Sequence, residues 1–462
     1  MKKTKIRKIM SGAEQILTQS NADKCDRVYF GNYPQNRISE ISNIRNKVKR
    51  IKGKDGNTYS IDPIAWRVLS NNLNDDGSLF LLSDKNLDVV KYHEEFIDIT
   101  WEKSTIRSWL NAYKETAEYE NNDFSEDNFK DFAFSEKEKN AIVITAVKTG
   151  ENSDFPNAEQ DGKAVSDQIF LLSVNEVISE EYGFRTKSKY DHNATENRKA
   201  RNTEYVENRC GKTGYSPTND EGFGVWWLRS PGYIPNFSAF IDSDGSVGSD
   251  GDCVNYYLIA VRPAFNLDLN SVLFTSAAKD GKLSDEGVLE IKEIPEYALF
   301  RVANDSYTQE IYRSWKVTLR DKSRDTFKVT KAQRMENALT IEYEGAIVPK
   351  NRHKKNEYIS VILADKVTGE FTHYGRVKQL EPEEFDRSGK VTIDFSGLVN
   401  SSDEIFDMNK KTLYVFNEQC NDDYRTDYAS ALIPVDGAEE NIVSGETKKD
   451  SEMKRKYFDV KI

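Results

Sequence analysis

The stretch that decides the fold is GFGVWWLRSPG at residues 222–232. Trp226 and Trp227 are adjacent, so in a strand their side chains point to opposite faces. We expect one ring to enter the core and the other to cover a flank. A buried Arg229 needs carboxylate or carbonyl partners, and the Pro-Gly pair at 231–232 ends the strand in a turn. The stretch therefore predicts a rigid buried strand that opens into a turn.

An irregular segment follows, YIPNFSAFIDSDGSVGSDGDCVNYYLIA at 233–260, before a closing strand VRPAFNLDL at 261–269. Tyr and Asn side chains combine a large contact area with adaptable hydrogen bonding, which is the chemistry of recognition loops. The alternative is that these aromatic rings pack on each other or on a second domain. Tyr257 and Ile259 are expected to point inward, because they lead into the closing strand. The predicted ligand-binding residues are Tyr233, Asn236, Phe237, Phe240, Asn255 and Tyr256.

The acidic residues of this segment offer a weak calcium hypothesis, with Asp242 and Asp244 as ligands. Carboxylates at alternating positions suit a hard cation, but the run lacks the length and the terminal Glu of a helix–loop–helix calcium site. Asp-Gly pairs at 244–245 and 250–251 are the usual signal for hairpin turns. We therefore expect two turns here and no metal.

Outside this segment, hydrophobic periodicity predicts a mixture of helices and strands. Ile64, Trp66 and Val68 alternate and should share one buried face of a strand. Ser104 and the Ser135–Glu138 capping box mark helix starts. The expected strands are 61–70, the run beginning at Ser78, and 141–147; the expected helices are 104–113, 135–140 and a short one within 194–209.

An ordered series of motifs resembles a bacterial family of C-type-lectin-like domains without assigned function. The series comprises YFGNYPQ (29–35), DPIAWRVL (62–69), FLLS (80–83), TWEKSTIRSWLN (100–111), FLLS (170–173), WWLRSPG (226–232) and VRPAF (261–265). This family is similar, remotely, to formylglycine-generating enzymes and to ligand-binding proteins diversified by retroelements. The resemblance implies a lectin-like fold in which Trp226, Trp227, Arg229 and Arg262 are structural scaffold. In the variable proteins, the region between the arginines forms the ligand surface.

The C-terminal part contains only strand signals, separated by Gly, Asp and Asn, which is typical of a sandwich. It resembles a small immunoglobulin-like β-sandwich found behind such lectin-like domains. The expected fold class is thus α+β, a C-type-lectin-like domain followed by an all-β sandwich. The strands expected are 298–303, 314–320, 326–332, 338–346, 357–365, 371–378, 390–397, 412–419 and 428–435. The expected organisation is a polar leader (1–26, one helix), the lectin-like domain (27–270), a connector (271–295), the sandwich (296–436) and a charged tail (437–462).

Composition narrows the classes of partner. The chain has 462 residues and a formal charge of −12, so its acidic surface disfavours nucleic acid. It contains no apolar stretch of about 20 residues, so no membrane insertion is expected. The basic N-terminus lacks an apolar signal region. The expected location is therefore the cytoplasm, while a cell surface or a phage particle stays open.

The four cysteines, Cys25, Cys210, Cys253 and Cys420, are far apart and match no metal spacing. Free thiols are expected, with a Cys210–Cys253 disulfide as the alternative. No cofactor is expected, and no nucleophile, base and orienting residue can be assembled. The predicted function is non-catalytic recognition of a protein or glycan through 233–257. The alternatives are an enzyme of the formylglycine-generating kind that uses Cys210 or Cys253, and a structural component of a phage or cell-surface assembly.

Overall fold

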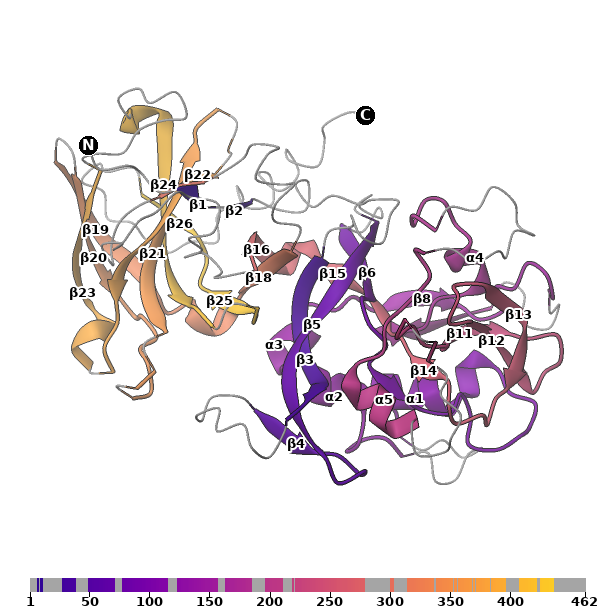
Figure 1. The fold of residues 1–462 in the computed structure, drawn as a ribbon. Coiled ribbons are helices and arrows are strands. Elements are labelled where there is room, and N and C mark those ends of the chain that lie inside the picture. The colour runs from indigo at the N-terminus through magenta and orange to yellow at the C-terminus, as the bar shows by residue number, and fades with distance from the viewer. Residues whose placement is uncertain are drawn as a thin grey trace. The chain divides into compact units, whose positions relative to one another are not determined.

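The structure is a computed structural model of the whole chain. It describes residues 6–7, 9–10, 27–38, 49–70, 77–114, 123–156, 163–184, 196–210, 218–219, 221–278, 300–302, 314–335, 338–351, 353–354, 356–367, 369, 371–382, 384–395, 407–421 and 424–435. The chain divides into two compact units. Unit 1 comprises Met1–Gln15 and Leu269–Ile462, and unit 2 comprises Ile16–Asp268. In Figure 1, unit 2 runs from indigo to magenta, and the strands of unit 1 are mostly orange and yellow.

Unit 2 combines short helices with several small sheets. Its strands are β3 (Arg27–Arg37), β4 (Arg50–Lys52), β5 (Thr58–Ser70), β6 (Ser78–Ser83), β7 (Asp88–Val89), β8 (Thr145–Lys148), β9 (Ala164–Asp167), β10 (Ile169–Phe170), β11 (Trp226–Pro231), β12 (Phe237–Ile241), β13 (Val247–Cys253), β14 (Ala260–Val261) and β15 (Ala264–Asp268). Its helices are η2 (Trp101–Lys103), α1 (Thr105–Asn111), α2 (Phe129–Ala133), α3 (Glu136–Lys139), α4 (Val174–Val177) and α5 (Glu204–Cys210). No helix in the described residues is long and apolar enough to cross a membrane.

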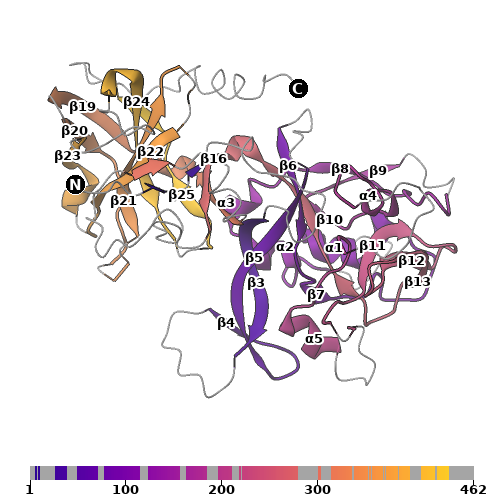
Figure 2. The same cartoon turned by 45° about the horizontal axis from the view of Figure 1, so that its top comes forward.

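Two sheets organise unit 2 (Figure 2). In the first, strands follow the order β3-β5-β6-β15-β10, and β4 pairs with β5. In the second, the order is β13-β12-β11-β14-β7, and only the β11–β14 pair is parallel. β8 and β9 form a separate pair. The closing segment therefore contributes β14 to one sheet and β15 to the other, which joins the two sheets.

Several local predictions for unit 2 are confirmed. Ile64, Trp66 and Val68 of β5 are 1%, 0% and 2% exposed, as their alternation requires. The Ser104 side chain accepts a hydrogen bond from the Arg107 backbone at the start of α1. The capping box of Ser135 and Glu138 is complete at the start of α3. Capping signals thus located these helix starts to the residue.

Three local predictions for unit 2 were wrong in extent. The strand expected at 141–147 is limited to β8, because residues 141–142 complete the turn after α3. The helix expected within 194–209 begins only at Glu204. The Asp-Gly pair at 244–245 does form the turn between β12 and β13, but the pair at 250–251 lies inside β13. There Gly251, with φ of 84°, belongs to an irregularity in the β12–β13 pairing.

Unit 1 is β-rich. Its strands are β1 (Ile6–Arg7), β2 (Ile9–Met10), β16 (Val272–Ala277), β17 (Phe300–Val302), β18 (Ser314–Arg320), β19 (Lys328–Met335), β20 (Ala338–Glu344), β21 (Glu357–Asp365), β22 (Phe371–Gln379), β23 (Gly389–Asp394), β24 (Lys411–Gln419), β25 (Asp427–Ala429) and β26 (Ile433–Val435). Short 3-10 turns are η4 (Leu269–Ser271), η6 (Lys322–Arg324), η7 (Glu384–Arg387) and η8 (Met408–Lys410). Every strand predicted between 298 and 435 overlaps one of these strands.

The unit 1 sheets form a sandwich. A small sheet β19-β20-β23 and a larger sheet that contains β22-β21-β24 enclose one hydrophobic core. Ile341 on the small sheet and Val361 and Val415 on the larger one are fully buried in that core. On its other face the larger sheet packs Phe274, Tyr374 and Phe416 into a second cluster. Burial on both faces explains why β21 reads as an almost continuous apolar run.

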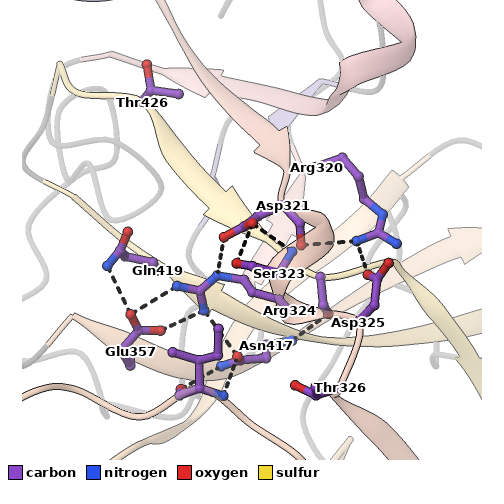
Figure 3. Close-up of polar contacts among 12 residues, drawn as sticks. Arg320, Asp321, Ser323, Arg324, Asp325, Thr326, Glu357, Asn417, Gln419 and Thr426 are labelled. Carbon is purple, nitrogen blue, oxygen red and sulfur yellow. Dashed lines mark hydrogen bonds and ion pairs between the residues drawn. The ribbon is translucent and has the colours of Figure 1, made fainter. Parts of the chain in front are cut away.

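A buried charged network holds one end of this sandwich together (Figure 3). The Arg324 guanidinium, 2% exposed, donates to Asp321 at 3.2 Å, to Glu357 at 2.7 and 3.0 Å and to Asn417 at 3.1 Å. Asn417 also accepts a hydrogen bond from the Ile347 backbone at 2.9 Å. The three charged groups, Arg324, Asp321 and Glu357, have partners within the network, so the network is structural.

The predicted leader and connector are also part of unit 1. Within 1–26, β1 pairs with β17 and β2 pairs with β16, where one helix was expected. Within 271–295, residues 272–277 form β16, which pairs with β18. These stretches are short and show no regular alternation of apolar residues, so only the sheet partners reveal them as strands. The tail at 437–462 and Cys25 lie outside the described residues.

Candidate functional site

The β11 strand is buried on both faces. Trp226 and Trp227 are both 0% exposed, so the expectation that one ring covers a flank was wrong. The Trp226 indole donates to the Arg198 carbonyl at 3.2 Å, and the Trp227 ring lies 5.8 Å from that of Tyr92. The strand is thus a rigid base for the residues that follow it.

Arg229 ties β11 to its surroundings. Its Nε donates to the Lys148 carbonyl at 2.8 Å, and Nη1 to the Leu171 carbonyl at 2.8 Å. Its guanidinium also pairs with Glu151 at 3.0 Å and with Glu176 at 2.5 Å. Glu176 belongs to the capping box of α4. Arg229 thus joins β11 to β8, to the backbone at Leu171 and to α4.

Arg262 makes a second clamp. It donates to the Ser83 carbonyl at 2.9 Å and to the Arg198 carbonyl at 3.1 Å, and its guanidinium lies 4.8 Å from the Trp226 ring. Arg198, which the sequence analysis missed, is itself fully buried and donates to the Gly245 carbonyl at 2.8 Å. It lies in a polar stretch without periodicity, so no sequence signal marked it as buried.

Four aromatic rings form a continuous row, which we call the aromatic row: the exposed Phe96, Tyr233 and Phe155, and the half-buried Phe237. Their ring centroids are 6.3 Å apart for Phe96–Phe237, 5.4 Å for Tyr233–Phe237 and 6.3 Å for Phe155–Tyr233. Tyr233 is 55% exposed, Phe96 49% and Phe155 36%. Large apolar rings are costly to leave in water, so their accumulation at one place indicates a contact surface.

The backbone beneath the aromatic row is firmly held. The Tyr233 N–H donates to the Asp250 carbonyl at 2.9 Å. Asn152, 2% exposed, donates from its amide to the Pro231 and Ser249 carbonyls at 2.7 and 2.8 Å. Its Oδ1 accepts from the Phe155 N–H at 3.3 Å. One buried side chain therefore fixes the loop of Phe155 against the strands that carry Tyr233.

The other predicted ligand residues lie in different surroundings. Phe240 is half-buried, and its ring packs closely over Gly248, where a side chain would have no room. Asn236, Asn255 and Tyr256 are also half-buried. Tyr257 is 51% exposed, so its expected inward orientation was wrong, whereas Ile259 is 2% exposed as expected. The structure therefore brings Tyr233 and Phe237 together in the aromatic row and leaves the other four predicted residues out of it.

Sequence reasoning missed Phe96 and Phe155, the two ends of the aromatic row. Each is an aromatic residue in a polar, acidic loop, EEFID at 94–98 and SDFP at 153–156. A large aromatic residue in such an acidic loop is the signal that could have found it. That the two loops meet at Tyr233 depends on the tertiary fold.

The surroundings of the aromatic row are acidic. Between Arg229 and Arg262 the sequence contains four Asp residues and no Lys, Arg or His. Glu95 and Asp98, on either side of Phe96, are exposed, and so is Asp250. Low-dielectric rings surrounded by carboxylates favour a ligand that combines an apolar group with positive charge.

The structure gives little support for a metal. Asp242 accepts from the Ser243 N–H at 2.6 Å, and Asp244 from the Ser246 N–H at 2.7 Å, as in ordinary turns. In unit 1, Glu418, Cys420 and Asp427 have ligand atoms within 4.8 Å of one another. However, Asp427 pairs with Lys316 at 3.0 Å, and Glu418 accepts from Ser360 and Tyr374 at 2.7 Å each. These oxygens already have protein donors.

Cys253, on β13, is a free thiol, as is Cys420. Burial and the neighbouring Asp252 raise the pKa of the Cys253 thiol. A raised pKa lowers the thiolate fraction, which is the opposite of the activation that a nucleophilic cysteine needs. The Cys210 side chain lies outside the described part of the chain.

Comparison with known proteins shows that most of unit 2 is similar to a family that has no assigned function. No curated protein and no solved structure matches the chain. A family model described as "Domain of unknown function (DUF6273)" matches residues 76–269. The match includes the aromatic row and the arginine clamps. The aromatic row is therefore part of a region that is similar to this family.

Proposed function

We propose that this protein is a non-catalytic recognition protein and that unit 2 binds a polypeptide through the aromatic row. The observation that carries the proposal is the contiguous aromatic row, in which three exposed rings and the half-buried Phe237 lie on a backbone fixed by Asn152. Rigid aromatic anchors supply contact area at little entropic cost. A stable scaffold that carries such rings on its loops is a common design for binding.

The composition of the surface favours a polypeptide over a glycan. Three of the four rings are Phe, and Ile97, next to Phe96 in the chain, is 36% exposed, so the row itself is mainly apolar. Glycans need hydrogen-bond partners for their many hydroxyls, whereas aliphatic and aromatic side chains of a peptide need mainly apolar contact. The acidic surroundings favour Lys or Arg beside the apolar anchor. The ligand class is therefore a basic peptide segment with a central apolar residue.

We further infer that unit 2 has the C-type-lectin-like fold and that unit 1 is an immunoglobulin-like sandwich. The ordered motifs from 29 to 265 support the first assignment, and the two-sheet core of unit 1 supports the second. In the variable lectin-like proteins the segment between the two scaffold strands carries the ligand surface. Tyr233 and Phe237 come from that segment.

The test is a peptide array probed with the full chain. The short peptides carry a central Phe, Leu or Tyr flanked by Lys, by Gln or by Glu. We expect binding to the Lys-flanked set, little to the Gln-flanked set and none to the Glu-flanked set. A Phe96→Ser/Tyr233→Ser variant should lose about tenfold or more in affinity, since central aromatic anchors contribute ~2 kcal/mol each.

The matched control is Ile144→Ser, because Ile144 is 68% exposed in unit 2 and contacts none of the four rings. Circular dichroism checks that both variants fold. Binding that ignores the flanking charge, or that survives in Phe96→Ser/Tyr233→Ser, would contradict the proposal. If the chain bound specific glycans on a glycan array and none of the peptides, the ligand would be a glycan.

A further inference from the structure

A cleft of about 480 Å³ opens in unit 2, separate from the four rings of the aromatic row. This volume falls within the range of small-molecule sites. Its walls combine charged side chains with aromatic rings, which include Trp109, Phe132, Tyr205 and Tyr257. Phe132 and Tyr257 are 41% and 51% exposed, so flat apolar faces are available to a ligand. Lining residues come from β3, β4, α1, α2, α5 and the edge strand β7. Figure 2 labels these elements.

A buried carboxylate forms the floor of the cleft. Asp88, at the start of β7, is 3% exposed and accepts hydrogen bonds from the Tyr33 hydroxyl at 2.5 Å and the Val89 N–H at 2.7 Å. Arg209, in the last turn of α5, pairs with the other side of this carboxylate. Burial raises the pKa of Asp88, which Arg209 opposes, and burial with Asp88 nearby raises the pKa of Tyr33. The contacts of this floor hold the Arg209 guanidinium in place.

Only part of the Arg209 guanidinium is hydrogen-bonded to the described part of the protein. Nη1 donates to Asp88 and, at 3.3 Å, to the Tyr205 hydroxyl. Within the part of the chain that the structure describes, Nε and Nη2 have no hydrogen-bond partner. The side chain is 30% exposed and lines the cleft. An Arg edge made of Nε and Nη2 matches the two oxygens of a carboxylate.

The mouth of the cleft adds positive charge to this acidic protein. Lys52, Lys54 and Lys91 all line it. Lys91 pairs with Glu94 at 2.9 Å, and Lys54 lies 4.0 Å from Asp127, while no described acidic group pairs with Lys52. Glu94 and Asp127 line the cleft as well and pair with two of these lysines, so the positive charge available to an anion comes from Lys52 and the Nε and Nη2 edge of Arg209.

We propose that this cleft binds a small molecule in which a single carboxylate is attached to a flat ring. The ring stacks between the exposed faces of Phe132 and Tyr257, and the carboxylate takes the Nε and Nη2 edge of Arg209. A single negative charge fits better than a phosphate dianion, because Asp88 already shares the same guanidinium. The site is independent of the peptide surface, so either proposal can fail alone.

The test uses 2-naphthoate and its neutral amide, 2-naphthamide, as probes of the full chain by isothermal titration calorimetry. The two probes share shape and ring area and differ in charge. We expect naphthoate to bind about tenfold more tightly than naphthamide, as a charge-assisted pair provides. Naphthyl phosphate should bind more weakly than naphthoate. Equal affinities for the acid and the amide, or a preference for the phosphate, would overturn the proposal.

Variants locate the binding. Arg209→Gln should abolish the preference for naphthoate over naphthamide, and Phe132→Ala should weaken both probes equally. Because Arg209→Gln leaves Asp88 buried without its cation, the double variant Arg209→Gln/Asp88→Asn serves as the folding-neutral version. Arg201→Gln, an exposed arginine that does not line the cleft, is the control. A preference for naphthoate that persists in the double variant would show that the anion binds elsewhere.

Discussion

At the scale of single residues, Arg229 shows how one side chain can determine the stability of the site. It joins β11 to the backbone at Lys148 and Leu171 and to the carboxylates of Glu151 and Glu176. Arg229→Gln would leave these largely buried groups without their cation. The free energy of unfolding should fall by about 3–5 kcal/mol, the usual cost of breaking a buried pair.

Urea unfolding followed by tryptophan fluorescence measures this effect in unit 2, because five of the six tryptophans lie there. Lys148→Gln is the matched control, since Lys148 is 65% exposed and pairs with the same Glu151. An exposed pair contributes at most about 1 kcal/mol. If the two variants were equally destabilised, Arg229 would not be the clamp that its contacts indicate.

Asp84 is a single residue that should make the stability of unit 2 depend on pH. It pairs with Arg67 at 2.6 Å and with Arg27 at 3.1 Å. Burial alone would raise the pKa of this carboxyl, but the two guanidinium groups outweigh it and hold the pKa well below its usual range. A pKa that is lower in the folded state stabilises the protein above the unfolded value, about 4, and this stability is lost as the pH falls further.

The prediction is that unit 2 unfolds progressively more easily as the pH drops below about 4, and that Asp84→Asn flattens this dependence. The measurement is the urea midpoint at a series of pH values between neutral and strongly acidic. Asp98→Asn, an exposed acidic residue of the same unit, is the control. An unchanged slope in Asp84→Asn would assign the acid sensitivity to other carboxylates.

At the scale of elements, the irregular β12–β13 pair positions the aromatic row. Gly251 has φ of 84°, and a Cβ added there would lie 2.8 Å from the Ser238 carbonyl oxygen. The neighbouring Asp250 carbonyl is the acceptor for the Tyr233 N–H. Gly251→Ala should therefore cost more than about 1 kcal/mol of stability and also displace Tyr233.

Two measurements separate these effects: the urea midpoint, and the affinity for the best Lys-flanked peptide of the array. We expect both to fall in Gly251→Ala. Gly56→Ala is the control, because Gly56 also has a positive φ, 86°, but lies in open space away from β12 and β13. A destabilised Gly251→Ala protein that binds the peptide normally would mean that this irregularity does not position the ring.

The elements also show how far the sequence could predict the fold. Helix starts were predictable at Ser104 and Ser135, because a cap is a local interaction. Strands of the sandwich were predictable because apolar residues alternate along strands such as β20, or form a continuous run as in β21. The Asp-Gly pair at 250–251 and the strand at 272–277 were not, because the first belongs to an irregular pairing and the second, β16, pairs with β18 and β2, which lie far away in the sequence.

The same distinction between local and long-range interactions applies to the candidate site. Tyr233 and Phe237 were predictable because their segment is rich in aromatic and turn-forming residues. Phe96 and Phe155 were not, because they join the aromatic row only through tertiary contacts. Arg209 and Asp88 were missed for the same reason, since 121 residues separate the two partners.

At the scale of the whole molecule, the net charge of −12 affects encounters with ligands. An acidic surface attracts a basic peptide over distances comparable to the Debye length and mainly raises the association rate. Contact between rings determines the dissociation rate instead, because desolvated apolar contacts are insensitive to salt. The two parts of the proposed recognition should therefore respond differently to ionic strength.

We predict that raising NaCl from about 0.05 to about 0.5 M slows association of a Lys-flanked peptide by about tenfold or more while the dissociation rate changes little. Surface plasmon resonance measures both rates. The same peptide with Gln in place of Lys is the control, and its association rate should be nearly independent of salt. Phe96→Ser should show the converse, with faster dissociation and unchanged salt dependence, because it removes a ring and no charge. If salt altered the dissociation rate as strongly as the association rate, the acidic residues would contact the bound peptide directly. The proposal that the acidic residues act only on association, and the rings only on dissociation, would then be wrong.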